Sequence, residues 1–171
     1  MKRMIVMSDS HGERETLCRL VQQVWAQCPG QVDAHIHCGD GARDFADLKE
    51  MLLAHDPEAQ LHMVKGNCDT ETDVPDEAQF ELEGLRIMIC HGQAYRVRLC
   101  KMFLRHAAAR RGCAVALYGH THVPAETSTG RVTMFNPGAA KLGCIGLMEV
   151  NDGRATFHRL QLDECGKFKE A

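Results

Sequence analysis

Short apolar runs of strand length recur along this chain, and each one ends in a polar loop that carries a histidine, an aspartate or an asparagine. The runs cover residues 4–7, 34–38, 61–64, 85–90 and 115–118. Most of the polar side chains that follow them stand next to a glycine, which permits tight turns and close approach of the backbone to a small ligand. A chain with this pattern is constrained to bring its strand ends to a common place.

Helical patterns separate the early runs. In residues 13–28, apolar side chains recur at three- and four-residue spacings until Pro29 and Gly30 end the pattern. Further helices are predicted over 42–53 and 98–111, and a hairpin over 77–83 and 85–90. Residues 123–162 are rich in β-branched residues and predict antiparallel strands that form a second sheet packed on the first. This order favours an α/β fold with a mixed sheet.

Length and composition bound the class of protein. The 171 residues predict a single domain over 1–163, followed by a polar tail over 164–171 that frays. A formal net charge of −3 argues against a dedicated nucleic-acid partner, and no apolar run approaches the ~18 residues that cross a bilayer. The nine cysteines contain no C-x-x-C pair, so we expect reduced thiols in a cytoplasmic protein.

The polar loops supply a set of candidate metal ligands. Because the carboxyl ends of parallel strands meet at one edge of a sheet, these side chains can converge. A nitrogen and oxygen set without sulfur suits Mn, Fe, Co, Ni or Zn. Seven candidate ligands are more than one ion normally takes from a protein. Two ions that share one carboxylate would use all seven, and two-metal centres of this kind catalyse phosphoryl displacement. The candidates are Asp9, His11, Asp40, Asn67, His91, His120 and His122.

Other polar residues have more ordinary interpretations. The remaining histidines lack the strand-end and glycine context and are expected to be structural or exposed, with His37 the one nearest to the candidate ligands. The basic segment that contains Arg96 and Arg98 fits the solvated face of a helix, although either arginine could instead hold a substrate phosphate. Few aromatic residues fall near the motifs, and Tyr95 is the only candidate for stacking against a nucleotide base.

The ordered motifs resemble those of the calcineurin-like metallophosphoesterases, and the likeness is greatest to the small bacterial and archaeal branch of YfcE-like phosphodiesterases. The resemblance runs from residue 1 to about 162 and rests on Asp9-x-His11, Gly39-Asp40, Gly66-Asn67-Cys68-Asp69, His91-Gly92, Gly119-His120-Thr121-His122 and Asn136-Pro137-Gly138. It implies a four-layer α/β/β/α sandwich of two mixed sheets flanked by helices.

The resemblance also implies roles for the candidate ligands. One divalent ion would be bound by Asp9, His11 and His122, and a second by Asn67, His91 and His120, with manganese favoured for both. Asp40 would bridge the two ions. A hydroxide held between the ions would attack phosphorus, and Asn67 would help to steady charge on the phosphoryl oxygens.

Two departures from the family pattern bear on activity. Cys68 stands where many larger members carry a histidine that protonates the leaving oxygen, and a thiol with an ordinary pKa of ~8.5 is a poor substitute. This predicts slow turnover or substrates with good leaving groups. Gln93 stands where some relatives carry a further histidine. Supporting roles near the metal centre, or plain turn roles, are open for Asp69 and Asn136.

Two hypotheses for function follow. The first is a binuclear metal-dependent phosphodiesterase that acts on a small phosphodiester, with a nucleotide-specific enzyme as a special case. The second is a protein-binding scaffold like the retromer subunit Vps29, whose fold and motifs are similar, with a vestigial or structural metal site. An exposed apolar patch away from the metal edge would favour the scaffold. The oligomeric state stays open, including a homo-oligomer.

Overall fold

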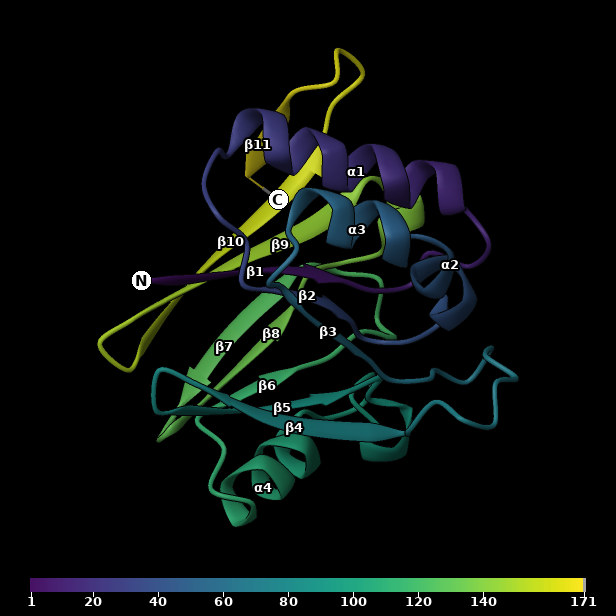
Figure 1. The fold of residues 1–171 in the computed structure, drawn as a ribbon. Coiled ribbons are helices and arrows are strands. Elements are labelled where there is room, and N and C mark those ends of the chain that lie inside the picture. Colours follow the sequence, from purple (N-terminus) through teal and green to yellow (C-terminus); the bar gives the residue numbers. More distant parts are fainter. Residues whose placement is uncertain (171) are drawn as a thin grey trace.

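The computed structural model describes residues 1–170, which form two facing β-sheets with helices on both outer sides (Figure 1). The first sheet has the strand order β11-β10-β9-β1-β2-β3 and the second has the order β4-β5-β6-β8-β7. The first sheet contains β1 (Lys2–Met7), β2 (Ala34–His37), β3 (Gln60–Met63), β9 (Cys144–Asn151), β10 (Arg154–Leu162) and β11 (Phe168–Glu170). The second contains β4 (Glu77–Leu82), β5 (Leu85–Cys90), β6 (Val115–Leu117), β7 (Ala125–Thr129) and β8 (Val132–Asn136).

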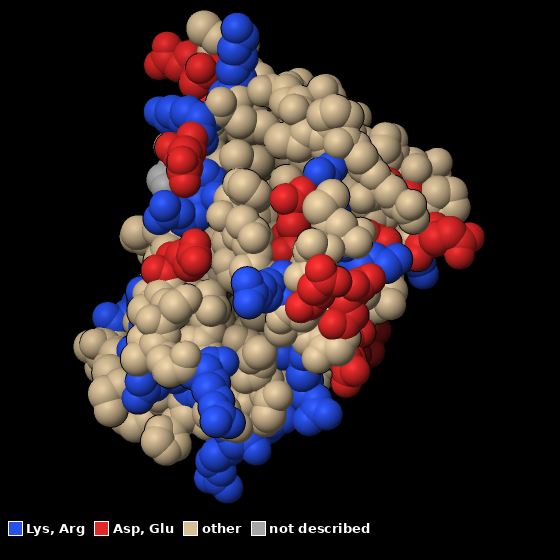
Figure 2. All heavy atoms as spheres, turned by 90° about the vertical axis from the view of Figure 1, so that its left-hand side faces the viewer, with Lys and Arg blue, Asp and Glu red and all other residues tan. Residues whose placement is uncertain are grey.

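The helices complete four layers. Three of them, α1 (Arg14–Gln27), α2 (Ala42–Asp47) and α3 (Lys49–His55), belong to the side of the first sheet, and α4 (Met102–Arg110) covers the second (Figure 1). Two short 3₁₀ turns, η1 (Gln93–Tyr95) and η2 (Ala140–Leu142), follow β5 and β8. Figure 2 shows Lys and Arg side chains gathered over the lower part of the molecule, the layer of α4. The α/β sandwich that the motifs predicted is confirmed.

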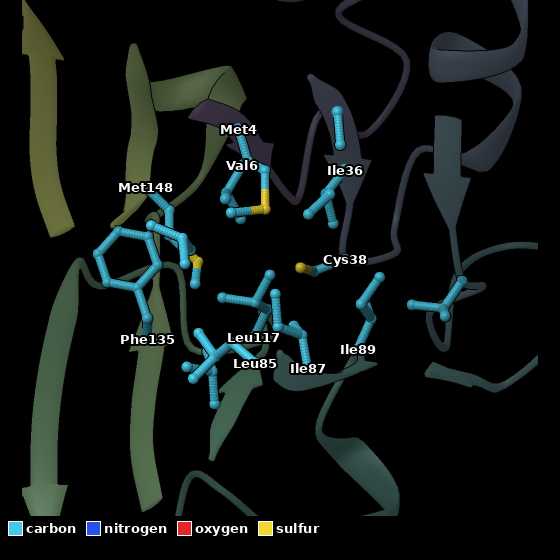
Figure 3. Packing of buried hydrophobic residues seen from close by; sticks show 14 residues of the cluster. Met4, Val6, Ile36, Cys38, Leu85, Ile87, Ile89, Leu117, Phe135 and Met148 are labelled. Atoms are coloured by element: carbon cyan, nitrogen blue, oxygen red, sulfur yellow. The ribbon is translucent and has the colours of Figure 1, made fainter. Parts of the chain in front are cut away.

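Alternation along the central strands explains why these strands are buried on both faces. In β1, Met4 and Val6 pack between the sheets, whereas Ile5 and Met7 pack toward α1. Figure 3 shows the layer between the sheets, where side chains of β1 and β2 meet those of β5 and β6. A strand that packs against apolar neighbours on both faces has a continuous apolar sequence, and the run in β1 has this pattern.

Parallel pairing brings the strand ends together. In the first sheet, β1 pairs in parallel with β2, and β2 with β3, while in the second β5 pairs with β6, and β6 with β8. The carboxyl ends of these six strands therefore gather at one edge of the sandwich, on the right in Figure 1. This edge carries the candidate ligands.

Two predicted helices differ from those observed. The helix expected over 42–53 is divided into α2 and α3 at Leu48, whose N–H bonds to the carbonyl of Phe45 at 3.1 Å. This tighter turn allows both Phe45 and Leu48 to be buried against the first sheet. The helix expected over 98–111 begins only at Met102, because residues 96–100 form a turn in which the amides of Leu99 and Cys100 both bond to the carbonyl of Arg96.

The C-terminal strands do not form a sheet of their own, so this expectation was wrong. Strands β7 and β8 complete the second sheet, and β9, β10 and β11 complete the first. The chain crosses between the sheets over residues 137–143, where the N–H of Ala140 bonds to the carbonyl of Ser8 at the end of β1. The crossing is set by this distant pairing and leaves no local signal.

Residues 164–170 differ from the frayed tail that their polarity predicts. The Asp163 carboxylate accepts hydrogen bonds from the amides of Cys165 and Lys167 at 2.9 and 2.8 Å and so forms a turn. Strand β11 then pairs with β10, and Phe168 packs against the layer that contains α1. Ala171 lies outside the described residues, and the extent of the domain over 1–163 stays a prediction.

Candidate metal centre

Five loops at the shared edge are held together by backbone hydrogen bonds. The amide of Asp9 bonds to the carbonyl of Gly39 at 3.0 Å, and the amide of His11 to the carbonyl of Asp40 at 2.9 Å, so the loops after β1 and β2 are tied in register. The loops after β5 and β6 are tied in the same way, because the amide of Gly119 bonds to the carbonyl of His91 at 3.1 Å. Both sheets therefore contribute to the site.

The first group of side chains contains Asp9, His11 and His122. The Nε2 atoms of His11 and His122 lie 3.1 Å apart, and Oδ1 of Asp9 lies 3.1 Å from Nε2 of His122 and 3.7 Å from that of His11. Burial lowers the pKa of His122, and the Asp9 carboxylate only partly opposes this. Imidazole nitrogens that converge beside a buried carboxylate oxygen are suited to a divalent cation.

A second group contains Asp9, Asp40 and His91, all fully or almost fully buried. Nε2 of His91 lies 3.2 Å from Oδ2 of Asp40, which is also 3.7 Å from Nε2 of His11. Asp40 thus stands between the two groups. Burial raises the pKa of Asp40, but the adjacent His91 imidazole and the N–H of Cys68, 2.8 Å from Oδ1, outweigh burial and hold it below its usual range.

Hydrogen bonds from outside the groups aim the ligand atoms inward. Nδ1 of His91 lies 2.8 Å from the carbonyl of Cys38, which fixes a proton on Nδ1 and turns Nε2 toward Asp40. Oδ2 of Asp9 accepts hydrogen bonds from Ser8 Oγ at 2.6 Å and from the His120 amide at 3.0 Å, which leaves Oδ1 facing the centre. The last contact also joins a loop of each sheet.

Two atoms at the heart of the site fit a cation in particular. Oδ1 of Asp9 and Nε2 of His91 are fully buried and form no hydrogen bond among residues 1–170. Buried polar atoms without partners are rare and costly, and an anionic oxygen and an imidazole lone pair are both satisfied by a divalent ion. The donor set therefore fits the ions that the sequence predicted.

The structure brings five of the seven predicted ligands together in these groups, places His120 beside His91 and leaves Asn67 at the rim. The ring of His120 lies 5.0 Å from that of His91, centroid to centroid, and burial and the neighbouring His91 lower its pKa. Asn67 follows on the loop after β3 but is exposed, and its Nδ2 donates to Sγ of Cys68 at 3.2 Å. Cys68 itself lies close to His11 and Asp40, and burial together with the Asp40 charge raises the pKa of its thiol.

The backbone at the site is strained. Positive φ angles between 50° and 68° occur at Asp9, His11, Asp40, His120 and His122. Such angles are uncommon outside glycine and cluster at functional sites, where the surrounding structure enforces them. Sharp loops of this kind turn side chains from separate strands toward one point.

Close approach explains two of the neighbouring glycines. A Cβ on Gly66 would lie 2.5 Å from the amide nitrogen of Asp40, and one on Gly119 would lie 2.7 Å from Oδ2 of Asp9. Real Cβ atoms do not come so close to such atoms, so a side chain at either position would displace a ligand. The glycines beside the ligands in the sequence are therefore required by packing.

Several residues support the ligand loops, although the sequence alone left their roles undecided or did not indicate them. The carboxylate of Asp69 accepts hydrogen bonds from the amides of Asp40 (2.8 Å), Gly41 (2.9 Å), Ala42 (3.1 Å) and Gly66 (2.7 Å). The side chain of Asn136 donates to the Gly119 carbonyl at 2.8 Å and accepts from the Gly138 amide at 2.8 Å, so it supports the loop after β6. Both residues position ligand loops.

Asp44 also supports the site, and no sequence pattern predicts this role. From α2 it accepts hydrogen bonds from Ser10 Oγ at 2.6 Å and from the Gly12 amide at 2.9 Å, and so holds the loop after β1. A carboxylate on a helix is most often solvated, and no motif marks this one. His37, the remaining histidine that lies nearest to the candidate ligands in the sequence, also supports this loop. Its ring lies beside Ser10, and burial lowers its pKa to about 4.

A fold of two facing mixed sheets, with aspartate and histidine side chains from both at one edge, is that of a metallophosphoesterase. Residues 1–161 match the model of the calcineurin-like phosphoesterase superfamily domain, and the chain belongs to this superfamily. It falls in the small YfcE-like phosphodiesterase branch, as the motifs predicted. By homology the chain is a metal-dependent phosphoesterase, and membership implies divalent metal ions.

Individual relatives agree with this assignment. The chain is 30% identical over 138 residues to "Probable metallophosphoesterase YsnB" of Bacillus subtilis, covering 81% of this chain and 75% of that protein. It is 25% identical over 156 residues to "Phosphodiesterase YfcE" of Escherichia coli, covering 83% and 81%. Vps29 of Cryptosporidium parvum shares the fold alone, with a TM-score of 0.79, 17% identity and coverage of 99% and 95%. No helix within residues 1–170 is long and apolar enough to cross a membrane.

Proposed function

We propose that this chain is a binuclear, metal-dependent phosphodiesterase that acts on small phosphodiesters. The observation that carries the proposal is the position of Asp40 between two groups of ligand atoms, each of which includes Oδ1 of Asp9. Divalent ions bound there supply an activated water and Lewis-acid stabilisation of the phosphoryl oxygens.

The residues divide between two ions as follows in this proposal. Asp9, His11 and His122 hold one ion, whereas Asn67, His91 and His120 hold the other, with Asp40 shared. Asn67 is the exposed member, and its amide is free to turn from Cys68 Sγ toward an ion and a phosphoryl oxygen. Manganese is the proposed metal, because the family resemblance favours it and a set of oxygen and imidazole donors admits it together with Fe, Co, Ni and Zn.

Cys68 limits the substrates that fit this site. Its raised pKa keeps the thiol protonated near neutral pH, but a thiol is a weak hydrogen-bond donor to a leaving oxygen. We therefore expect slow turnover where the leaving group is an alkoxide, and faster cleavage where it is already stable as an anion, as in an aryl ester. This agrees with a phosphodiesterase of modest turnover.

The experiment compares metal content and cleavage of bis-p-nitrophenyl phosphate in wild type and Asp40→Asn. Wild type loaded with Mn²⁺ is expected to bind two ions per chain and to cleave the ester. Asp40→Asn should lose an ion and at least about 100-fold in activity, because loss of an outer partner alone costs about 10–100-fold. Asp47→Asn on α2, whose side chain is 48% exposed, is the matched control and should behave as wild type.

Absence of cleavage by fully loaded protein with every divalent ion tested (Mn, Fe, Co, Ni and Zn) would overturn the proposal and favour a Vps29-like scaffold. One observation bears on that second candidate: Leu99, Met102 and Phe103 are large apolar side chains and are exposed. They follow Arg98, whose guanidinium donates to the His120 carbonyl at 2.9 Å. This apolar segment therefore begins beside the metal edge, and a patch remote from that edge is what the scaffold requires.

A further inference from the structure

A groove of about 790 Å³ lies between η1 and the outer face of α4. Its walls include Tyr95 and Arg96 on one side and Phe103, His106, Arg110 and Arg111 on the other. No carboxylate lines it. The groove lies in the layer that contains α4 and is lined by three arginines.

Its charges are unevenly neutralised. The Arg111 guanidinium pairs with the Glu77 carboxylate at 3.0 Å, and the same carboxylate accepts a hydrogen bond from the phenol of Tyr95. Arg96 and Arg110, by contrast, form no ion pair and no side-chain hydrogen bond within residues 1–170. Two exposed guanidiniums facing one hollow, with no acid to balance them, are suited to a phosphate group.

Aromatic rings accompany these cations. Tyr95 is held in place by Glu77, and Phe103 lines the groove although 59% of it is exposed. The exposed ring of Phe103 is therefore accessible to a flat group in the groove. Aromatic faces beside guanidiniums are the combination that binds a base and its phosphate together.

The groove adjoins the metal centre along the chain and in space. Tyr95 and Ala94 also line a second hollow of about 350 Å³, whose wall includes His91. The turn η1 begins two residues after His91, and Arg98 just beyond it is bonded to the carbonyl of His120. A ligand in the groove would therefore lie against the loop after β5, which carries His91.

We propose that the groove between η1 and α4 binds a phosphorylated nucleoside, with Arg96 and Arg110 on its phosphate and Phe103 and Tyr95 against its base. The substrates would then be small nucleotide phosphodiesters in which one arm carries a second phosphate. The statement about substrates rests on the proposed function, whereas binding in the groove does not.

The binding test uses metal-free protein and AMP, measured by isothermal titration calorimetry. AMP should bind to wild type, and Arg96→Ala and Arg110→Ala should each weaken binding by about tenfold or more, because each removes a charge-assisted contact. Phe103→Ala should weaken binding by about fivefold or more through loss of stacking. Arg105→Ala is the matched control, because Arg105 lies on α4 but does not line the groove. Adenosine and ribose 5-phosphate should each bind more weakly than AMP.

The kinetic test uses Mn²⁺-loaded protein and two dinucleotides that share one scissile bond, pApA and ApA. Wild type should show a KM at least about tenfold lower for pApA, and the Arg96→Ala, Arg110→Ala double variant should lose this preference, whereas the control Arg105→Ala should keep it. If AMP does not bind, or if wild type and the double variant bind it equally, the proposal that the groove binds a phosphorylated nucleoside is wrong. AMP binding that depends on both arginines, together with no cleavage of any diester, would support the nucleotide site in the groove and overturn the proposed phosphodiesterase activity.

Discussion

Asp69 shows how far a single carboxylate positions the metal edge. Its two oxygens accept hydrogen bonds from four backbone amides in the loops after β2 and β3. In Asp69→Asn one oxygen becomes an NH₂ group that faces N–H donors. We expect the free energy of unfolding to fall by about 2–3 kcal/mol in urea titration, because charge-assisted hydrogen bonds are lost and donors are left unpaired.

The same variant should also bind metal more weakly, by about 10–100-fold, since Asp40 loses the loop that orients it. Titration with Mn²⁺ under competition by a chelator measures this. Asp73→Asn is the control: Asp73 is exposed on the segment that follows, and its change should move stability by no more than about 0.5 kcal/mol. Equal metal affinity in both variants would show that Asp69 forms an ordinary turn.

His35 carries a prediction about pH at the end of the fold remote from the metal edge. Nε2 of this fully buried histidine lies 2.8 Å from Oδ2 of Asp56, which also accepts from Nε1 of Trp25 at 3.0 Å. Burial lowers the pKa of His35, and Asp56 only partly opposes this. The folded protein therefore keeps His35 neutral at a pH where the unfolded chain, with an ordinary pKa of ~6.5, takes up a proton.

The sign follows from that difference. Below about pH 6.5 the unfolded state binds more protons, so the free energy of unfolding falls as the pH falls, by at most about 1.4 kcal/mol per pH unit from one group. In metal-free protein, His35→Gln should flatten the decline between pH 7.5 and 5.5 measured by urea denaturation. The exposed His106, changed to Gln, should leave the slope as it is. A slope that His35→Gln leaves intact would assign the pH dependence to other groups.

At the scale of elements, the loop after β3 depends on the small size of one residue. A Cβ at position 66 would lie 2.5 Å from the backbone nitrogen of Asp40, which belongs to the adjacent loop. Gly66→Ala must therefore push the two loops apart, at about 1–3 kcal/mol of stability, as overpacking does elsewhere. We also expect Mn²⁺ binding to weaken, again by competition titration. Lys65→Ala, one residue earlier and without this contact, should bind metal as wild type does.

The elements also show which features a sequence can predict. The strands of the edge were predictable because apolar runs, glycines and polar strand ends are local signals, and the strand-end rule then places their side chains together. The division of 42–53 at Leu48 and the crossing at 137–143 were not, because they depend on packing against β1 and on the hydrogen bond from the Ala140 amide to the Ser8 carbonyl. The role of Asp44 was not predictable for the same reason, since only the tertiary fold turns its carboxylate toward the loop after β1.

At the scale of the whole molecule, the site joins the two sheets. The first sheet contributes Asp9, His11, Asp40 and Asn67 through the loops after β1, β2 and β3, and the second contributes His91, His120 and His122. Ions held by both sets would therefore connect layers that otherwise meet through apolar packing and a few hydrogen bonds such as that from the His120 amide to Asp9. Metal binding should then be coupled to the stability of the entire fold.

This coupling predicts that chelation lowers the melting temperature. An ion at 100 times its dissociation constant stabilises the folded state by about 2.7 kcal/mol, which corresponds to about 5–10 °C in a chain of this length. Calorimetric scans with Mn²⁺ and with EDTA measure the difference. Asp40→Asn should lose most of the shift, whereas Asp47→Asn should keep it. If wild type melts at one temperature with and without saturating Mn²⁺, then the buried aspartates and histidines do not bind this ion, because an ion that binds only the folded chain must raise its stability.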